Sequence, residues 1–384
     1  MFNYVLIHYG ELGLKGQNRP EFEKRLIENI GKALEKQEYG TIKKAQARII
    51  MELNEKSNTE KIEESLRRVF GIAWFAFIYR TEPDLESVKD LVGEKFRLAP
   101  GTKARVSAKR ADKTLMFTSM DADRELGTYL VSEFDAKISL NEPETTIFVE
   151  FAQGNAYVFD RKIRGPYGLP VGVSGKVLHL LSGGLDSPVA AWLLMKRGCQ
   201  VEFLHFHAFR KFEKNKNSKI LDLVDILKQY CFKSRVFFVP FYPFEAEAVE
   251  APERYRLILF RRFMFRVAEQ LAKKHGIDAL SSGENLAQVS SQTLENIAVI
   301  NRATSMTMLR PLLTYEKDEI VKLARQIGTF EISTRPYKDC CQLFMARHPA
   351  TKAKLQVVES IEKKLNLNEA IAESLDKTET VDVE

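Results

Sequence analysis

The sequence predicts two small α+β domains followed by a larger α/β domain with a parallel sheet. Up to about residue 162, short apolar strand patterns alternate with amphipathic helix patterns. Residues 164–175, RGPYGLPVGVSG, interrupt both patterns with glycine and proline, as expected of a linker. From Lys176 onward, apolar strands alternate with longer helices, which is typical of a parallel sheet covered by helices on both faces.

The region before the linker divides into two sets of elements. The first set comprises expected strands at 4–9, 46–53 and 72–80 and expected helices at 19–37 and 58–70. Their alternating order favours a ferredoxin-like layer. The second set comprises expected helices at 84–97 and 119–134 and expected strands at 103–109, 145–151 and 156–162.

The region after the linker carries further strand patterns, at 176–182, 201–207, 234–241, 277–283 and 308–313. Ligands of such sheets bind at the carboxyl ends of the strands, so the loop after the first strand is the expected site. The acidic end of the chain, residues 376–384, lacks a core pattern, and we expect it to fray.

Composition narrows the class of protein. The 384 residues are 45% hydrophobic, enough to give several domains a core each. We find no leader-peptide pattern and no apolar stretch of the ~18 residues that a membrane span needs. Four cysteines, two of them adjacent, do not make a disulfide framework, which indicates a reducing cytoplasm. Because the sequence has no apolar span, we expect no membrane partner.

The net charge of +6 is modest, but basic residues gather at 103–113, 161–165 and 254–266. Such clusters are typical of proteins that bind phosphate-rich partners, with a solvated surface as the alternative. Strand alternation places Lys103, Arg105 and Lys109 nominally on one face, and Arg110 completes this set of candidate contacts.

The loop Ser182-Gly183-Gly184-Leu185-Asp186-Ser187 follows the buried strand and precedes a helix. Its glycines suit a backbone that wraps around a phosphate at a helix N-terminus. Asp186 should repel such an anion, and the lysine of the common G-x-x-x-x-G-K-[ST] loop is absent. One alternative is a glycine turn in which Asp186 only caps the following helix.

The pattern S-G-G-x-D-S after a buried strand resembles the PP-loop ATP pyrophosphatases, which cleave ATP to AMP and pyrophosphate and have a Rossmann-like parallel sheet. The resemblance implies that the loop holds the β and γ phosphates as a leaving pyrophosphate that travels with Mg²⁺. Asp186 would then face the metal, whose charge inverts the local electrostatics.

A wider resemblance joins this loop to SSGENLAQVSSQT (281–293), LRPLLTYEKDEIVKLARQIGT (309–329) and YKDCCQLF (337–344). Together these segments resemble the tRNA uracil 4-sulfurtransferases, which convert uridine 8 of tRNA to 4-thiouridine through adenylation of the uracil O4. Residues 104–127 resemble the RNA-binding THUMP domain, and 8–26 resemble the opening segment of the same enzymes. The implied domains are 1–78 (ferredoxin-like), 79–165 (THUMP) and 166–384 (PP-loop ATP pyrophosphatase).

The resemblance also assigns roles to single residues. It implies that ATP contacts Leu180, Leu181, Ser182, Gly183, Gly184, Asp186, Ser187, His205, Phe206, Arg261, Gly283 and Gln292. Lys317 would stabilise charge on the adenylyl phosphate, although an ordinary lysine in the first turn of a helix is the alternative. Cys341 is the implied sulfur-handling cysteine, with Cys340 as a bystander or resolving thiol. Cys199 and Cys231 lie in apolar stretches and are expected in the core.

Longer members of this family carry a rhodanese domain for which this sequence ends too soon. We therefore expect a cysteine desulfurase or another sulfide source as the sulfur donor, and a role in making the thiazole of thiamine is placed in doubt. The family also implies a homodimer that presents tRNA across subunits. Two alternatives stay open: a PP-loop tRNA thiolase or adenylating enzyme with another acceptor, and a non-catalytic THUMP-type RNA-binding protein.

Overall fold

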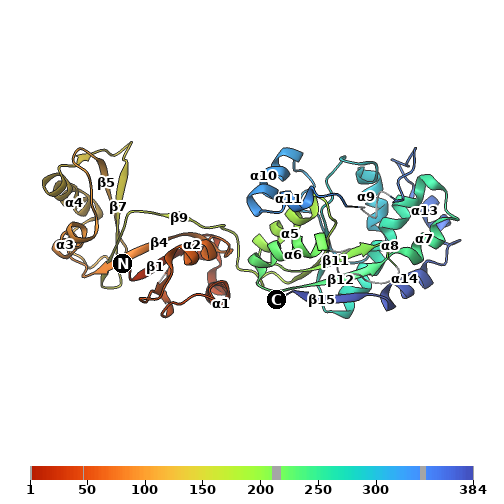
Figure 1. The fold of residues 1–384 in the computed structure, drawn as a ribbon, viewed down its shortest axis with the longest axis horizontal. Coiled ribbons are helices and arrows are strands. Elements are labelled where there is room, and N and C mark those ends of the chain that lie inside the picture. Colours follow the sequence, from red (N-terminus) through yellow and green to blue (C-terminus); the bar gives the residue numbers. More distant parts are fainter. Residues whose placement is uncertain (1, 46, 210–217, 338–342, 384) are drawn as a thin grey trace. The chain divides into compact units, whose positions relative to one another are not determined.

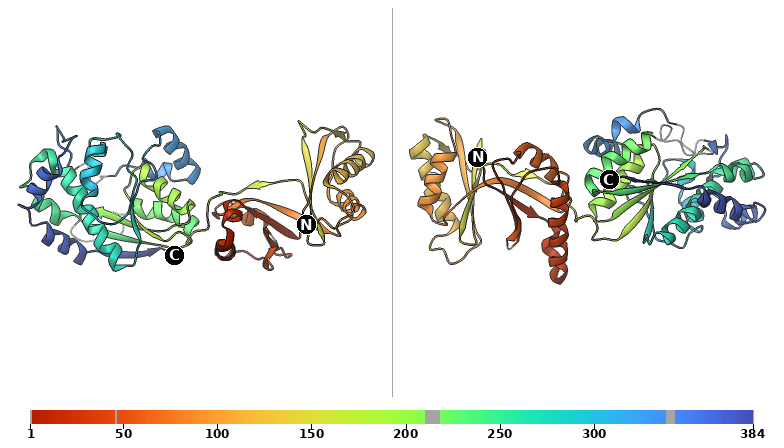
Figure 2. Two further views of the ribbon diagram at one scale, coloured as in Figure 1. Left: turned by 180° about the vertical axis from the view of Figure 1, so that it is seen from behind. Right: turned by 60° about the horizontal axis from the view of Figure 1, so that its bottom comes forward.

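A computed structural model describes residues 2–45, 47–209, 218–337 and 343–383. The chain forms two compact units, Met1–Gly168 and Leu169–Glu384, which Figures 1 and 2 show as separate bodies of helices and strands. Each unit has its own sheet, so each is described by itself.

The first part of unit 1 is the expected ferredoxin-like layer. Its elements are β1 (Tyr4–Tyr9), η1 (Glu11–Leu14), η2 (Gly16–Asn18), α1 (Arg19–Ala33), β2 (Ile42–Ala45), β3 (Arg48–Glu52), α2 (Thr59–Leu66) and β4 (Ile72–Thr81). The strands lie in the order β2-β3-β1-β4. Strand β2 was not predicted, because its sequence IKKA is short and half charged; its backbone pairing with β3 holds it in the sheet.

The second part of unit 1 continues the same sheet. Its elements are α3 (Leu85–Lys95), β5 (Lys103–Arg110), α4 (Ser119–Phe134), β6 (Lys137–Ile138), β7 (Thr145–Ala152), β8 (Asn155–Phe159) and β9 (Ile163–Arg164). Strand β4 joins the two parts, since it pairs with β1 along most of its length and with β8 through Tyr79–Thr81. The inward side chains of β5 pack with those of α3 and α4 in one apolar cluster.

Unit 2 is a sheet with helices on both faces (Figures 1 and 2). Its strands are β10 (Lys176–Leu180), β11 (Gln200–His207), β12 (Ser234–Pro240), β13 (Ala279–Ser282), β14 (Met308–Leu309) and β15 (Glu379–Val383). Its helices are α5 (Asp186–Lys196), α6 (Ser218–Cys231), α7 (Tyr242–Ala248), α8 (Glu253–Lys274), η4 (Ser290–Gln292), α9 (Leu294–Asn301), α10 (Lys317–Ile327), α11 (Phe330–Ser333), α13 (Leu355–Glu362) and α14 (Leu367–Asp376). The fold class is the one predicted: an α/β unit after α+β elements.

The end of the chain corrects one expectation. Residues 379–383 do not fray but form β15, which pairs antiparallel with β12 from Ser234↔Val383 to Phe238↔Glu379. Backbone hydrogen bonds to an otherwise open strand edge do not depend on a core pattern, so the acidic sequence gave no sign of them. Arg235 on β12 also pairs with Asp382, at 2.8 Å.

The strand order β14-β13-β10-β11-β12-β15 places the loop after β10 at a reversal of the sheet. The chain leaves β10 toward β11 on one side, while β13 lies on its other side. Crevices at such reversals, outside the carboxyl ends of the strands, are where open α/β sheets bind ligands. Among the described residues, no helix is both long and apolar enough to cross a membrane.

Candidate functional site

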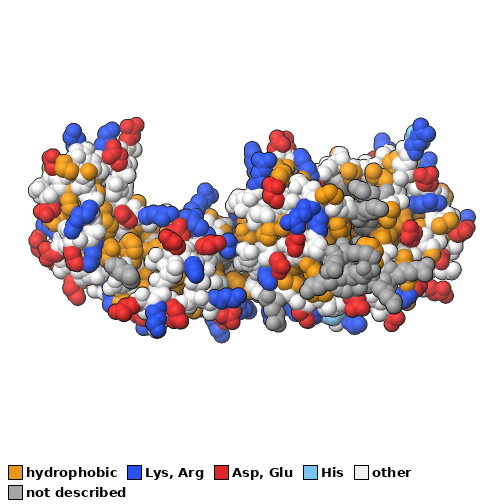
Figure 3. Space-filling model, in the orientation of Figure 1, with side chains coloured by type: hydrophobic (Ala, Val, Ile, Leu, Met, Phe, Trp, Pro, Cys, Tyr) orange, Lys and Arg blue, Asp and Glu red, His pale blue; other side chains and the backbone are white. Residues whose placement is uncertain are grey.

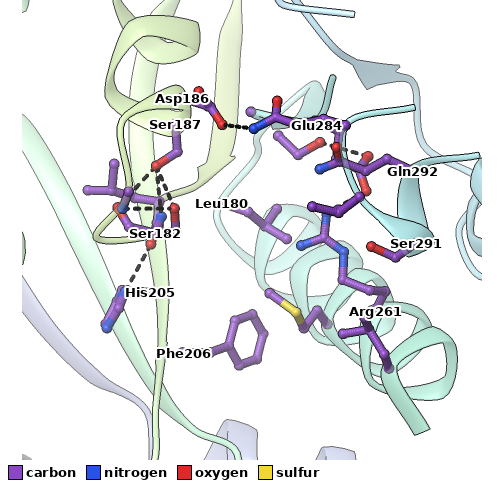
Figure 4. A pocket seen from close by; sticks show the side chains of 18 of the residues that line it. Leu180, Ser182, Asp186, Ser187, His205, Phe206, Arg261, Glu284, Ser291 and Gln292 are labelled. Atoms are coloured by element: carbon purple, nitrogen blue, oxygen red, sulfur yellow. Dashed lines mark hydrogen bonds and ion pairs between the residues drawn. The ribbon is translucent and has the colours of Figure 1, made fainter. Parts of the chain in front are cut away.

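A cavity of about 360 Å³ opens at this reversal, within the size range of small-molecule sites (Figure 4). One wall is the loop after β10, with Ser182, Asp186 and Ser187. The opposite wall comes from the segment after β13 and from α8. The structure brings together nearly all of the residues predicted to contact ATP, which lie here as Leu180, Leu181, Ser182, Gly184, Asp186, Ser187, His205, Phe206, Arg261, Gly283 and Gln292.

The glycine loop is held in shape by its own serines. Ser187 is 3% exposed, and its hydroxyl donates to the Ser182 carbonyl at 3.0 Å. The backbone N–H of Ser182 donates to Ser187 Oγ at 3.0 Å, and that of Gly184 donates to Ser182 Oγ at 3.3 Å. The loop is therefore preformed, with the Ser187 hydroxyl engaged inside it (Figure 4).

Two glycines allow the backbone of this wall to pack closely. A Cβ at Gly283 would lie 2.7 Å from Cα of Ser187, so only glycine lets β13 approach the loop. A Cβ at Gly183 would lie 2.8 Å from the ring of Tyr337, which covers the loop at that point. The close fit of backbone to backbone leaves the loop little freedom to move.

Asp186 does not cap the helix that it begins. The N-cap of α5 is Leu185, without a side-chain cap bond, so the capping alternative is wrong. The Asp186 carboxylate instead accepts a hydrogen bond from Lys317 Nζ on Oδ1 at 2.6 Å, and one from Gln288 Nε2 on Oδ2 at 3.1 Å. Residues more than 100 positions apart thus meet on one carboxylate at the cavity.

Arg261 lines the opposite wall and is held by a buried acid. Glu284 is 1% exposed and accepts hydrogen bonds from both Arg261 and Arg310, and also from the Ser282 hydroxyl at 3.0 Å. Burial opposes the charge on Glu284, but the two guanidinium groups outweigh it and lower its pKa to about 2. The group is an ion cluster in which Glu284 fixes the direction of Arg261.

Two further arginines of the basic cluster 254–266 correct the role expected from charge alone. Arg262 is 1% exposed, and together with Arg266 it donates to the Glu362 carboxylate at 2.8–2.9 Å. These two cations fasten α8 to α13 and present no phosphate-binding surface. Their acid partner lies about 100 residues away in the sequence, which is why the cluster looked unpaired.

The far end of the cavity suits a flat heterocycle. Leu180, Phe206 and Met264 give it apolar walls, and Gln292 places Oε1 there as a buried acceptor with no hydrogen-bond partner among the described residues. The amino group of adenine is a matching donor. His205 is 3% exposed and uses its ring nitrogens on the Leu181 carbonyl at 2.9 Å and on the Tyr337 hydroxyl at 2.8 Å.

The side chains at the cavity could bind a metal ion only together with oxygen atoms of a bound ligand. In the described part of the chain, no three His, Cys, Asp or Glu side chains come close enough to hold a metal ion. Asp186 is the acid that faces the cavity from the glycine loop. A divalent cation would therefore be shared between Asp186 and phosphate oxygens, as Mg²⁺ commonly is in nucleotide sites.

The cysteines separate into two groups. Cys199 and Cys231 are buried, as expected, and burial raises both thiol pKa values, that of Cys231 to about 12, so neither is a ready nucleophile. Cys340 and Cys341 lie outside the described residues. The residue that leads into their segment, Tyr337, is described and lies on the glycine loop.

The candidate RNA contacts lie on β5 of unit 1. Lys103, Arg105 and Lys109 are exposed on one face of the strand, while Ala104, Val106 and Ala108 between them are buried. Arg110 lies on the other side and donates to the carbonyls of Leu115 and Phe117 at 2.8 and 2.7 Å. The exposed residues of β5 form a local basic strip. Figure 3 shows that Lys and Arg side chains are elsewhere interspersed with Asp and Glu on the visible face of unit 1.

Comparison with known proteins agrees with this geometry. Residues 172–367 match the family described as thiamine biosynthesis protein (ThiI), residues 4–76 match the ThiI ferredoxin-like domain, and residues 79–160 match the THUMP domain. The chain belongs to the ThiI family.

Relatives in the ThiI family match from end to end. A probable tRNA sulfurtransferase of Moorella thermoacetica is 39% identical, covering 100% of this chain and 98% of the relative. A probable tRNA sulfurtransferase of Coxiella burnetii is 40% identical, covering 99% of each chain. A 4-thiouridine synthetase solved with RNA and bound ATP has a TM-score of 0.87 and 30% identity, with 100% of both chains covered.

Membership of the ThiI family does not by itself explain every residue at the cavity. Sequence reasoning missed Gln288, Glu284 and Tyr337, each of which contacts a predicted residue. It also missed Arg310, which pairs with Glu284. Gln288 and Glu284 stand in the segment SSGENLAQVSSQT, but nothing in their spacing to Asp186 or Arg261 reveals the contact. Only folding brings these partners together.

Proposed function

We propose that this protein is an ATP-dependent tRNA sulfurtransferase that converts uridine 8 of tRNA to 4-thiouridine. The observation that carries the proposal is the pairing of Asp186 with Lys317 beside a preformed S-G-G-L-D-S loop at the sheet reversal. Support comes from full-length relatives named as tRNA sulfurtransferases and from the likeness to a 4-thiouridine synthetase holding RNA and ATP.

The first step is adenylation of the base. The uracil O4 attacks the α phosphorus of ATP, a new P–O bond forms, the bond to the β phosphate breaks, and pyrophosphate leaves. The glycine loop and the first turn of α5 present backbone N–H groups to the β and γ phosphates. Mg²⁺, shared by Asp186 and those phosphates, would neutralise the leaving charge.

We assign Lys317 to the transferred group. It is the first residue of α10, where the helix dipole disfavours a cation. Its side chain is half exposed and reaches Asp186 instead of an acid on its own helix. A lysine in this position adds little to stability, which favours a role in stabilising charge on the adenylyl phosphate.

The second step delivers sulfur. A persulfide sulfur attacks C4 of the adenylated base, the C4–O bond breaks, and AMP leaves in place of a poor oxygen leaving group. The base is then joined to the sulfur carrier by a disulfide, and a second thiol attacks the carrier sulfur, breaks the S–S bond and releases 4-thiouridine. Cys341 is either the carrier or this second thiol, and the disulfide that remains is reduced by an external thiol. Tyr337, which stands four residues before Cys341 in the sequence, lies on the glycine loop.

The tRNA and the donor complete the proposal. The exposed strip Lys103, Arg105 and Lys109 would hold phosphates of an A-form stem, whose grooves hide the base edges. The target base must leave its own contacts to reach the cavity, as flipped bases do elsewhere. A cysteine desulfurase or another persulfide donor supplies sulfur, and a homodimer presents tRNA from one subunit to the other.

Nucleoside mass spectrometry tests the function. Wild type is incubated with unmodified tRNA, Mg-ATP and sulfide. Cys341→Ser is incubated with a cysteine desulfurase in place of sulfide. The buried-cysteine variant Cys199→Ala is the control. We expect 4-thiouridine at position 8 with wild type and Cys199→Ala, and none with Cys341→Ser when the desulfurase is the donor. ATP splitting to AMP without any thiolated uridine would mean that the acceptor is wrong.

A further inference from the structure

The Asp186 carboxylate is held at two separate oxygens by residues from two different segments. Lys317 binds Oδ1 at 2.6 Å and Gln288 binds Oδ2 at 3.1 Å. Lys317 is needed at the adenylyl phosphate in the function proposed above, so its bond to Asp186 must break when nucleotide binds. Gln288 is an uncharged donor, and its bond to Asp186 can stay.

We propose that Gln288 is a positioning residue, which holds the Asp186 carboxylate toward the phosphate and metal side of the cavity when Lys317 leaves it. This inference rests on the proposed function for the role of Lys317. Gln288 is exposed and lines the cavity, and a hydrogen bond at such a place adds little to the stability of the fold. Its effect is therefore expected on nucleotide binding.

The backbone around Gln288 is shaped to aim this side chain. Ala287 has φ of +63°, a left-handed conformation that is uncommon for a residue with a Cβ. The turn is closed by hydrogen bonds from Ala287 N to Gln292 O at 2.9 Å and from Gln292 N to Val289 O at 2.8 Å. Strained backbone that its surroundings maintain is common at functional sites.

A second set of bonds fixes the segment of Gln288 to that of Lys317. The buried Asn285 amide donates to the carbonyls of Leu312 and Tyr315, and Leu286 N donates to Leu313 O at 3.1 Å. Tyr315 lies two residues before Lys317. These hydrogen bonds join the segment that carries Gln288 to the segment that carries Lys317. The distance between the two segments is therefore set before any nucleotide binds.

Calorimetric binding of the α,β-methylene analogue of ATP, with and without Mg²⁺, tests the role. We expect Gln288→Met to weaken binding in Mg²⁺ by about tenfold, the size of a lost hydrogen bond to a charged group. Binding without Mg²⁺ should change by less than about twofold, since Asp186 then has no metal to orient. Gln356→Met, an exposed glutamine on α13, is the matched control and should bind as wild type does.

Two further comparisons separate positioning from a structural effect. In an Asp186→Asn background, Gln288→Met should cause no additional loss, because the two residues act as one unit. Ala287→Gly should keep nucleotide binding, because glycine adopts the left-handed conformation without strain. Ala287→Val should weaken binding as Gln288→Met does. Residue 287 is exposed, so the valine meets no steric clash in the core, but a β-branched residue is strained in the left-handed region.

The proposal is overturned if Gln288→Met weakens binding equally with and without Mg²⁺, leaves both unchanged, or adds its full effect in the Asp186→Asn background. The readout is nucleotide binding and needs no acceptor. The result for Gln288 is therefore independent of whether wild type forms 4-thiouridine, which is decided by nucleoside mass spectrometry.

Discussion

The hydroxyl of Tyr337 lies 2.8 Å from Nε2 of His205, and the ring of the same tyrosine covers the glycine loop at Gly183. One side chain thus touches the floor of the nucleotide cavity and begins the segment that carries Cys340 and Cys341. The buried ammonium group of Lys219 lies 5.4 Å from the centre of this ring and donates to the carbonyls of Ser333 and Arg335. Tyr337 connects the proposed site of adenylation to the segment proposed to handle sulfur.

We expect Tyr337→Phe to separate the two chemical steps. The ring stays on Gly183, so affinity for the ATP analogue should change by less than about twofold, while formation of 4-thiouridine should fall about tenfold for the lost hydrogen bond. Tyr337→Leu should weaken both, because the ring is lost as well. Calorimetry and initial rates of 4-thiouridine formation measure the two effects; wild-type rates for Tyr337→Phe would show that the hydroxyl has no part in sulfur transfer.

Gly283→Ala should damage nucleotide binding without touching any functional side chain. The new Cβ would meet Cα of Ser187 at 2.7 Å, which forces the loop away from β13. We expect affinity for the ATP analogue to fall at least about tenfold, since small displacements at such sites are costly. Gly13→Ala is the control, because a Cβ there meets nothing within 4 Å. Equal binding by both variants would mean that the loop adapts freely.

Glu284→Gln should be strongly destabilising. Two guanidinium groups would be left buried without their common counter-ion, a change that typically costs about 3–5 kcal/mol. Urea unfolding followed by circular dichroism measures the loss. Glu373→Gln replaces an exposed glutamate of α14 that pairs with Lys377, and it should hardly move the unfolding midpoint. A midpoint for Glu284→Gln close to that of this control would contradict the buried-ion account.

Stability should fall in mild acid because of His179. Burial lowers its pKa from 6.5 to about 4, so the folded state favours the neutral ring. The unfolded chain binds this proton first, so the stabilisation is complete above pH 6.5 and is lost as pH falls toward 4, by about 3 kcal/mol. Burial lowers the pKa of His207 in the same direction.

Urea midpoints at several pH values between 7 and 4 measure this slope. His179→Gln should be less stable than wild type at pH 7, because it loses packing and the bond to Ser281, yet its stability should depend less on pH. If the slope of the variant equals that of wild type, another group is responsible.

Replacing Lys103, Arg105 and Lys109 with glutamine should weaken tRNA binding and its dependence on salt. Each lost phosphate contact is expected to reduce the slope of log affinity against log salt by about 0.7–0.9. Fluorescence anisotropy across a salt series measures it. Arg110→Gln should instead loosen the 111–118 loop, since its guanidinium holds the carbonyls of Leu115 and Phe117. An unchanged slope for the triple variant would exclude the β5 strip as a contact.

Much of the fold was determined by local patterns in the sequence. The short apolar run at 4–9 and the helical spacing at 119–134 coincide with β1 and α4, because such patterns depend only on residues that are close together along the chain. The S-G-G-L-D-S loop was likewise predictable, since its strand, glycines and helix are contiguous. The charge of the chain was misleading at α8, where Glu362 of a distant helix pairs with Arg262 and Arg266.

Tertiary structure alone decided which groups meet. Lys317 and Gln288 reach Asp186 across 131 and 102 residues, Glu284 joins Arg261 to Arg310, and β15 closes the edge of the sheet at β12. Such pairings depend on the order of strands in the sheet and on the direction of side chains in a cavity. A single sequence carries no local signal for either, because the energy of each contact arises only after distant segments have come together.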